Sequence, residues 1–68
     1  MITIKLNNVS TDLPNDYINL EELLEWKRIP TGGTAVAVNN KVVKHENWPL
    51  TTFNDGDNVV MISAAVGG

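Results

Sequence analysis

The residues with the clearest chemical use are Gly67 and Gly68, the last two positions of the sequence. A carboxylate on glycine has no side chain beside it, and glycine adopts backbone angles that other residues rarely reach. Such a terminus can enter a narrow channel and meet a nucleotide phosphate, where conversion to an acyl adenylate makes the carboxylate electrophilic. Small residues are also common at frayed chain ends, because nothing packs there. The pair therefore indicates either a reactive terminus or an idle tail.

The other residue types that catalyse reactions or bind metals form no catalytic pattern. His45 is the only histidine, and no Ser or Cys stands near it to complete a triad. Asp55-Gly56-Asp57 lacks the remaining ligands of a calcium loop and is typical of a tight turn. Thr31–Thr34 lacks the Lys-Ser/Thr ending of a phosphate loop and indicates a connection between a helix and a strand. Three acidic residues are expected on a solvated helix face: Glu21, Glu22 and Glu25.

Trp26 and Trp48 are the large aromatic residues. Packing in the core or at its edge is the ordinary role of such side chains, and anchoring a partner is the alternative. Trp48 stands in a segment without regular periodicity, so we expect it to be the better candidate for an interface.

The composition is that of one small globular domain, with 68 residues of which 43% are apolar and 19% are charged. The net charge of −3 argues against nucleic acid and against an anionic membrane surface, since both are bound through Lys and Arg. The lack of cysteine excludes disulfides and thiolate metal sites, and it is compatible with a cytoplasmic location. The alternating segment Met1–Leu6 is expected to be neither a signal peptide nor a membrane span. This length suits a carrier, modifier or adaptor better than a self-sufficient enzyme.

The N-terminal part of the chain predicts a β-hairpin. Ile2, Ile4 and Leu6 alternate with polar residues, which indicates a half-buried strand. Asn7-Asn8 suits a turn because asparagine tolerates positive φ, and a return strand is expected over Val9–Leu13.

The clearest helix signal follows. Asn19 and Glu22 form a capping-box pair, and Ile18 and Leu23 are spaced for a hydrophobic staple. Lys27-Arg28 suits the C-terminal turn of the helix, where the dipole favours positive charge. The apolar stripe of this helix consists of Leu20, Leu23 and Leu24.

Three more strands are expected, over residues 35–38, 42–43 and 59–64, with an irregular segment over residues 45–55. Together the elements predict an α+β domain: a mixed sheet of four to five strands with one helix packed on one face. We expect residues 1–64 to form this single domain and residues 65–68 to form a flexible tail ending in Gly-Gly.

The last predicted strand is apolar on both of its faces. Val59 and Met61 share one face, while Val60, Ile62 and Ala64 share the other. Such a strand is usually central, and a single helix covers only one side of the sheet, so the second face is expected to be free for a partner. The predicted partner-binding residues are Val60, Ile62, Ala64, Ala65, Val66, Gly67 and Trp48.

In order and spacing, these segments resemble the ThiS family of sulfur carriers, which are ubiquitin-like β-grasp proteins. The resemblance covers the whole chain. The segments that carry it are Ile2–Asn7, the capped helix with Leu20, Leu23 and Leu24, Val36–Asn40, Val42-Val43, Trp48, Asp55–Val59 and Val66-Gly67-Gly68. Asn40 departs from the pattern, because many relatives have glycine there, but asparagine reaches the same conformation.

The resemblance implies a protein co-substrate rather than an enzyme. Gly68 would be the site of adenylation and of thiocarboxylate formation. A ThiF-like adenylyltransferase would use ATP and magnesium, a sulfur donor protein would supply sulfur from a persulfide, and a ThiG-like thiazole synthase would receive it for the thiazole ring of thiamin. The chain itself would bind no cofactor. Since the sequence stops at the glycine pair, we expect the terminus to need no processing.

Two alternatives remain open. The small subunit of molybdopterin synthase has the same fold and the same terminal glycines, but such subunits tend to be longer and to carry an aromatic- and proline-containing segment that Ser63–Val66 lacks. The other alternative is a β-grasp interaction module with an idle glycine tail and no carrier chemistry. An enzyme in its own right is the least supported interpretation, because no nucleophile, base and orienting group occur together.

Overall fold

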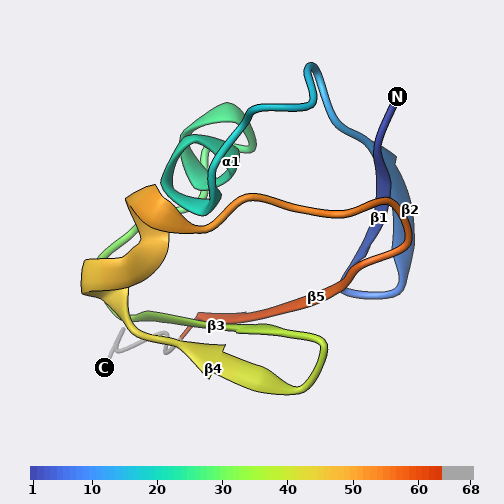
Figure 1. The fold of residues 1–68 in the computed structure, drawn as a ribbon. Helices are drawn as coiled ribbons and strands as arrows, with labels where there is room; N and C mark the ends of the chain where they lie inside the picture. Colours follow the sequence, from blue (N-terminus) through green and yellow to red (C-terminus); the bar gives the residue numbers. More distant parts are fainter. Residues whose placement is uncertain (64–68) are drawn as a thin grey trace.

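The computed structural model describes residues 1–63. It contains strands β1 (Thr3–Leu6), β2 (Val9–Asp12), β3 (Thr34–Val38), β4 (Lys41–Val43) and β5 (Asn58–Ser63), helix α1 (Leu20–Trp26) and the 3-10 helix η1 (His45–Leu50). The strands form one five-stranded sheet in the order β2-β1-β5-β3-β4. Helix α1 lies over one face of this sheet, with η1 beside it (Figure 1). The predicted mixed sheet with one α-helix across one face is confirmed.

The sheet is mixed because β1 and β5, its first and last strands in chain order, are neighbours and run parallel. β1 pairs with β5 in parallel, while β1 with β2, β3 with β4 and β3 with β5 are antiparallel pairs. β5 therefore lies at the centre of the sheet, as its two apolar faces predict.

Both hairpins are closed by an Asn-Asn turn. Asn7 and Asn8 have φ angles of 49° and 69°, and Asn39 and Asn40 have φ angles of 51° and 69°. A two-residue turn with positive φ at both positions matches the twist of the strands that it joins, and asparagine is one of the few residues that tolerate it. The predicted turns, including the conformation expected of Asn40, are confirmed.

Helix α1 begins at the predicted capping box. The Asn19 side chain accepts a hydrogen bond from the Glu22 backbone N–H at 2.8 Å, and Glu22 accepts one from the Asn19 backbone N–H at 3.1 Å. Ile18 and Leu23 are both buried, as a hydrophobic staple requires. The local sequence therefore specifies where this seven-residue helix starts.

The end of α1 differs from the expectation. The helix ends at Trp26, so Lys27 is its C-cap and Arg28 lies beyond it with a φ of 57°. The Arg28 and Ile29 N–H groups donate to Glu25 and Leu24, which closes the helix with a Schellman motif. Arg28 thus takes the left-handed position that glycine usually occupies.

A single hydrophobic core lies between the sheet and the two helices. It includes side chains from β1, β3 and β5, from α1 and η1, and from the connections around them. The buried apolar residues are Ile4, Leu6, Leu13, Ile18, Leu20, Leu23, Leu24, Val36, Trp48, Phe53, Val59 and Met61.

Candidate functional site

The candidate site is built on β5, which leads directly into residues 64–68. Val59 and Met61 point to the helix side of the sheet and are buried. Val60 and Ile62 point to the opposite side and are 38% and 64% exposed. The alternation predicted for this strand is therefore confirmed through Ile62.

The exposed side of β5 continues onto β3 and β4. The register places Ala35 opposite Ile62, and Ala37 opposite both Val60 and Val42. Directly opposite residues of antiparallel strands point to the same face, so these side chains form one apolar surface. We call this surface the outer patch; it consists of Ala35, Ala37, Val42, Val60 and Ile62.

The outer patch is an apolar surface that is largely exposed. Val42 is 78% exposed on the edge strand, while the alanines of β3 lie between Val42 and the β5 side chains. Lys5 and Ser10 lie on the same side of the sheet, on β1 and β2, so the patch has a polar border there. No described helix covers this side.

The sequence identified only part of this surface. Val60 and Ile62 were predicted from the apolar character of β5, whereas Ala35, Ala37 and Val42 were not. The alternation of alanine with Val36 and Val38 was the available signal for the two alanines. The predicted contact residues Ala64, Ala65, Val66 and Gly67, and the predicted reactive residue Gly68, lie outside the described residues.

The structure corrects the expectation for Trp48. Its side chain is only 1% exposed, and its Nε1–H donates a hydrogen bond of 3.0 Å to the Val43 carbonyl oxygen. The segment expected to be irregular folds as η1, and this helix places Trp48 in the core. A side chain enclosed in this way is not available as an interface anchor, so Trp48 has the structural role.

The other polar candidates have structural roles too. His45 lies at the start of η1, with its ring 4.3 Å from the Trp48 ring. Asp55 accepts the Thr3 backbone N–H at 2.8 Å. Asp57 is buried and accepts hydrogen bonds from the Asn54 backbone N–H at 2.8 Å and from the Asn39 side chain at 3.0 Å. The predicted tight turn is present here, with Gly56 at a φ of 89°.

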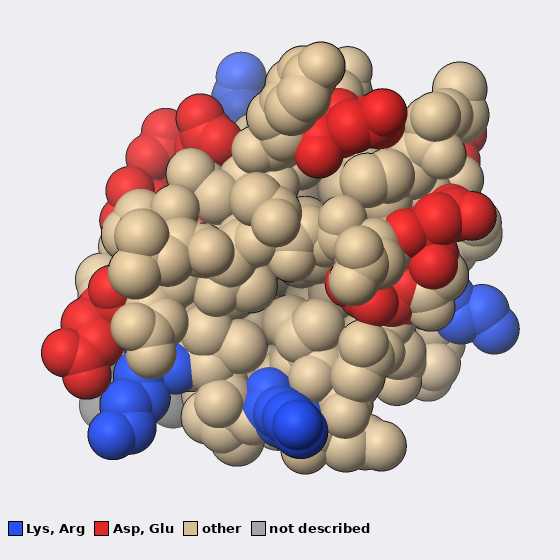
Figure 2. Space-filling model, in the orientation of Figure 1, with Lys and Arg blue, Asp and Glu red and all other residues tan. Residues whose placement is uncertain are grey.

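No potential metal centre occurs in the described part of the chain, since residues 1–63 contain no cluster of three or more His, Cys, Asp or Glu side chains. Nor does any helix within these residues have the length and apolar character needed to cross a bilayer. Acidic side chains are spread over the upper and lateral parts of the face in Figure 2, and basic ones gather mainly toward its lower edge. That view therefore contains no continuous surface of one charge.

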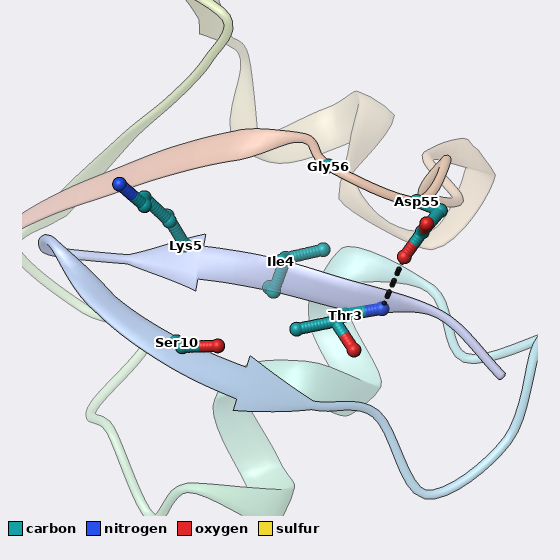
Figure 3. A pocket seen from close by; sticks show the side chains of 6 residues that line it. All are labelled: Thr3, Ile4, Lys5, Ser10, Asp55 and Gly56. Carbon is teal, nitrogen blue, oxygen red and sulfur yellow. Dashed lines mark hydrogen bonds between the residues drawn. The ribbon is translucent and has the colours of Figure 1, made fainter.

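A hollow of about 310 Å³ lies where β1 and β2 meet the turn before β5. Thr3, Ser10 and Lys5 line it from the strands, and Asp55 reaches it from the turn (Figure 3). The Asp55 carboxylate already accepts the Thr3 N–H. No histidine lines the hollow, and the Thr3 hydroxyl donates a hydrogen bond of 2.7 Å to the exposed Asp12 carboxylate, so the lining does not combine a nucleophile, a histidine base and an orienting group.

Comparison with known proteins agrees with this geometry. The ThiS family model matches residues 4–68. The fold is similar to the crystal structure of the thiamine biosynthesis protein ThiS from Geobacter metallireducens, with a TM-score of 0.83 and 25% identity over 98% of this chain and 100% of that one. It is also similar to the NMR solution structure of a thiamine biosynthesis protein from Geobacter metallireducens, with a TM-score of 0.80 and 28% identity over 98% and 88% of the two chains. No curated protein sequence matches significantly.

Proposed function

Because this chain belongs to the ThiS family, whose members are small carrier proteins rather than enzymes, we propose that it carries sulfur for thiamin thiazole synthesis on the carboxylate of Gly68. The fold is the β-grasp fold of that family. The observation that best supports the proposal is the position of β5. This central strand carries part of an exposed apolar patch and continues toward the glycine pair.

The proposed chemistry starts with activation of the terminus. A carboxylate is a poor electrophile, so a ThiF-like adenylyltransferase joins a Gly68 carboxylate oxygen to the α-phosphate of ATP, with release of pyrophosphate. Magnesium bound with the ATP on that partner neutralises the phosphate charge. The product is an acyl adenylate, and AMP is now a good leaving group.

Sulfur then replaces AMP. The terminal sulfur of a persulfide on a donor protein attacks the acyl carbon, and AMP leaves. A thiol cleaves the resulting sulfur–sulfur bond, which oxidises the thiol sulfur to a disulfide and leaves a thiocarboxylate on Gly68. A ThiG-like thiazole synthase receives the sulfur from this group. The carrier contributes the terminus and its presentation, while ATP and the reacting thiols belong to its partners.

The outer patch is proposed as the surface on which these partners dock. Because the patch includes side chains of β5, docking on it would fix the direction in which the chain after β5 enters a partner's active site. Val60 and Ile62 supply contacts from β5, and Ala64, Ala65, Val66 and Gly67 are proposed to continue them toward Gly68. Since the proposed partners use ATP and thiols, the proposal agrees with the cytoplasmic location expected from the cysteine-free sequence.

Intact mass measurement tests the chemistry. The protein is incubated with a ThiF-like adenylyltransferase, ATP, magnesium and a persulfide donor, and replacement of one oxygen by sulfur at Gly68 is the expected result. A variant with one alanine added after Gly68 is the control, and it should fold normally yet gain no sulfur. An unchanged mass with a partner that converts its own carrier would overturn the proposal.

A binding experiment then distinguishes the pathways. Thiocarboxylated protein should be retained by thiazole synthase and should transfer its sulfur there. Preferential binding to the large subunit of molybdopterin synthase would instead assign the carrier to the molybdenum cofactor. If a partner binds the protein both with and without the extra alanine, and neither form transfers sulfur, the protein is an interaction module.

A further inference from the structure

Two asparagines occupy matching positions on opposite sides of β5. Asn7 is the first residue of the turn between β1 and β2, and Asn39 is the first residue of the turn between β3 and β4. Their φ angles are 49° and 51°. Each uses its backbone N–H and its side-chain oxygen to hold the backbone of the central strand.

Asn7 holds β5 on the β1 side. Its backbone N–H donates to the Val59 carbonyl oxygen at 2.9 Å. Its Oδ1 accepts the Met61 backbone N–H at 2.8 Å, and its Nδ2 donates to the Met61 carbonyl oxygen at 3.3 Å. The described β1–β5 register ends at the pair Leu6–Val59, so the Asn7 side chain adds one further rung to this ladder.

Asn39 holds the start of β5 on the β3 side. Its backbone N–H donates to the Asn58 carbonyl oxygen at 2.7 Å, and its Oδ1 accepts the Asn58 backbone N–H at 2.9 Å. Its Nδ2 donates to Asp57, so this contact belongs to the turn that precedes the strand. The two asparagines use similar hydrogen bonds, but only Asn7 acts close to the end of β5.

We infer that Asn7 is a positioning residue for the terminal chemistry: its side chain, bonded to the Met61 backbone, keeps the end of β5 in the sheet so that partners meet the outer patch and the terminus in one arrangement. This inference rests on the proposed carrier function. Ile62 and Ser63 are the described residues that follow Met61. On its other side the end of β5 is paired with β3, where Ile62 lies opposite Ala35 and Ser63 opposite Thr34, so the Asn7 side chain is what holds this end on the β1 side.

The Asn7 side chain is expected to affect binding of the carrier rather than the rate of its reaction. Strand ends open at little cost in free energy, and two side-chain hydrogen bonds are enough to shift such an equilibrium. A carrier whose β5 end is often released on the β1 side binds its partner with an affinity reduced by the competent fraction. Once bound, the terminus reacts at the normal rate. Loss of the Asn7 side chain should therefore raise KM for the carrier and leave kcat nearly unchanged.

The test compares Asn7→Gly with Asn39→Gly. Glycine keeps the positive φ and the backbone N–H bond, so each variant removes only the side-chain hydrogen bonds. Sulfur transfer to Gly68 is followed by intact mass at several carrier concentrations with a ThiF-like adenylyltransferase. Asn7→Gly should raise KM about three- to tenfold, in line with the loss of such bonds. Asn39→Gly should lower thermal stability without raising KM.

Two further measurements complete the test. The Met61 amide should exchange with solvent faster in Asn7→Gly than in the unmodified protein, whereas Asn39→Gly should leave it protected. Asn7→Asp keeps the acceptor for the Met61 N–H but loses the donor, so its KM should lie between those of the unmodified protein and Asn7→Gly. If Asn7→Gly is poorly folded by circular dichroism, Asn7→Asp takes its place in the comparison.

The outcomes distinguish a failure of the Asn7 role from a failure of the carrier function. Unmodified protein that gains no sulfur overturns the carrier proposal and, with it, this role of Asn7. Unmodified protein that is converted, with Asn7→Gly showing the same KM, overturns the positioning role alone. An equal rise in KM for Asn39→Gly would also overturn it, because the effect would then be one of general stability.

Discussion

The side chains of Met61 and Ile62 are neighbours in sequence and lie on opposite faces of the same strand. Met61 is 8% exposed and packs in the core, whereas Ile62 is 64% exposed in the outer patch. The boundary between the core and the proposed docking surface thus runs between two consecutive residues of β5.

This relationship gives the first prediction. Ile62→Asp should weaken activation by the adenylyltransferase while changing the free energy of unfolding by no more than about 0.5 kcal/mol, because surface substitutions rarely cost more. Met61→Asp is the matched control, and it should unfold the domain or nearly so, since it buries a charge without a partner. Urea unfolding measures the stability of both variants. The rate of adenylation at several carrier concentrations measures activation. Severe destabilisation by Ile62→Asp would contradict the assignment of Ile62 to the exposed face of β5.

The two tryptophans should respond differently to the same replacement. Trp48→Phe removes the Nε1–H donor that bonds the Val43 carbonyl oxygen and leaves unfilled space in the core, so it should cost about 1–3 kcal/mol of stability. Trp26 is exposed on α1, and Trp26→Phe should cost less than about 0.5 kcal/mol. Chemical unfolding measures both values. In Trp26→Phe, the remaining fluorescence should also resist quenching by acrylamide; ready quenching would mean that Trp48 is accessible.

The helix should depend on its N-cap. Asn19→Ala removes the side-chain acceptor for the Glu22 N–H and should lower stability by about 1 kcal/mol. Asn19→Ser supplies another acceptor and should stay close to the unmodified protein. Thermal unfolding followed by circular dichroism at the helix band tests the pair. Equal loss in both variants would show that the side-chain amide matters for something other than the cap.

The two aspartates of the turn before β5 should also differ. Asp57 is buried and accepts two hydrogen bonds, so Asp57→Ala leaves two donors without their partner and should cost about 1–3 kcal/mol. Asp55 is exposed, and water can replace its single bond to the Thr3 N–H, so Asp55→Ala should cost less. Urea unfolding compares them. A larger loss for Asp55→Ala would contradict this assignment of the turn.

Local signals in the sequence were sufficient for most of the fold. The Asn-Asn pairs place both hairpin turns, because few other residues accept positive φ twice in succession. Asn19 and Glu22 specify the helix start, because each side chain bonds to the backbone N–H of the other residue, three positions away. Such a local contact can be recognised from the spacing in the sequence. The position of β5 follows from its apolar residues on both faces, since a strand of that kind is usually central.

Contacts between distant residues were not predictable in the same way. Trp48 is buried because η1 folds back over β4, and the segment has no periodicity from which burial follows. The hydrogen bonds between the Asn7 side chain and the Met61 backbone join residues 54 positions apart. In the sequence, the position of Asn7 in a turn already accounts for the asparagine, so nothing points to this contact. Only the parallel pairing of β1 with β5 reveals that the same side chain has a second role.

That parallel pairing also bears on how the protein is made. The first strand of the domain has β5 as its neighbour, so contacts of high sequence separation must form before the sheet is complete. A nascent chain that has been translated only through Leu50 has β1, β2, β3 and β4, but it lacks the strand that joins the two hairpins. The sheet is therefore complete only after β5 has been synthesised. A chain that ends before Asn58 leaves the two hairpins without the strand between them and their shared core incomplete, so we expect it to be open to proteolysis.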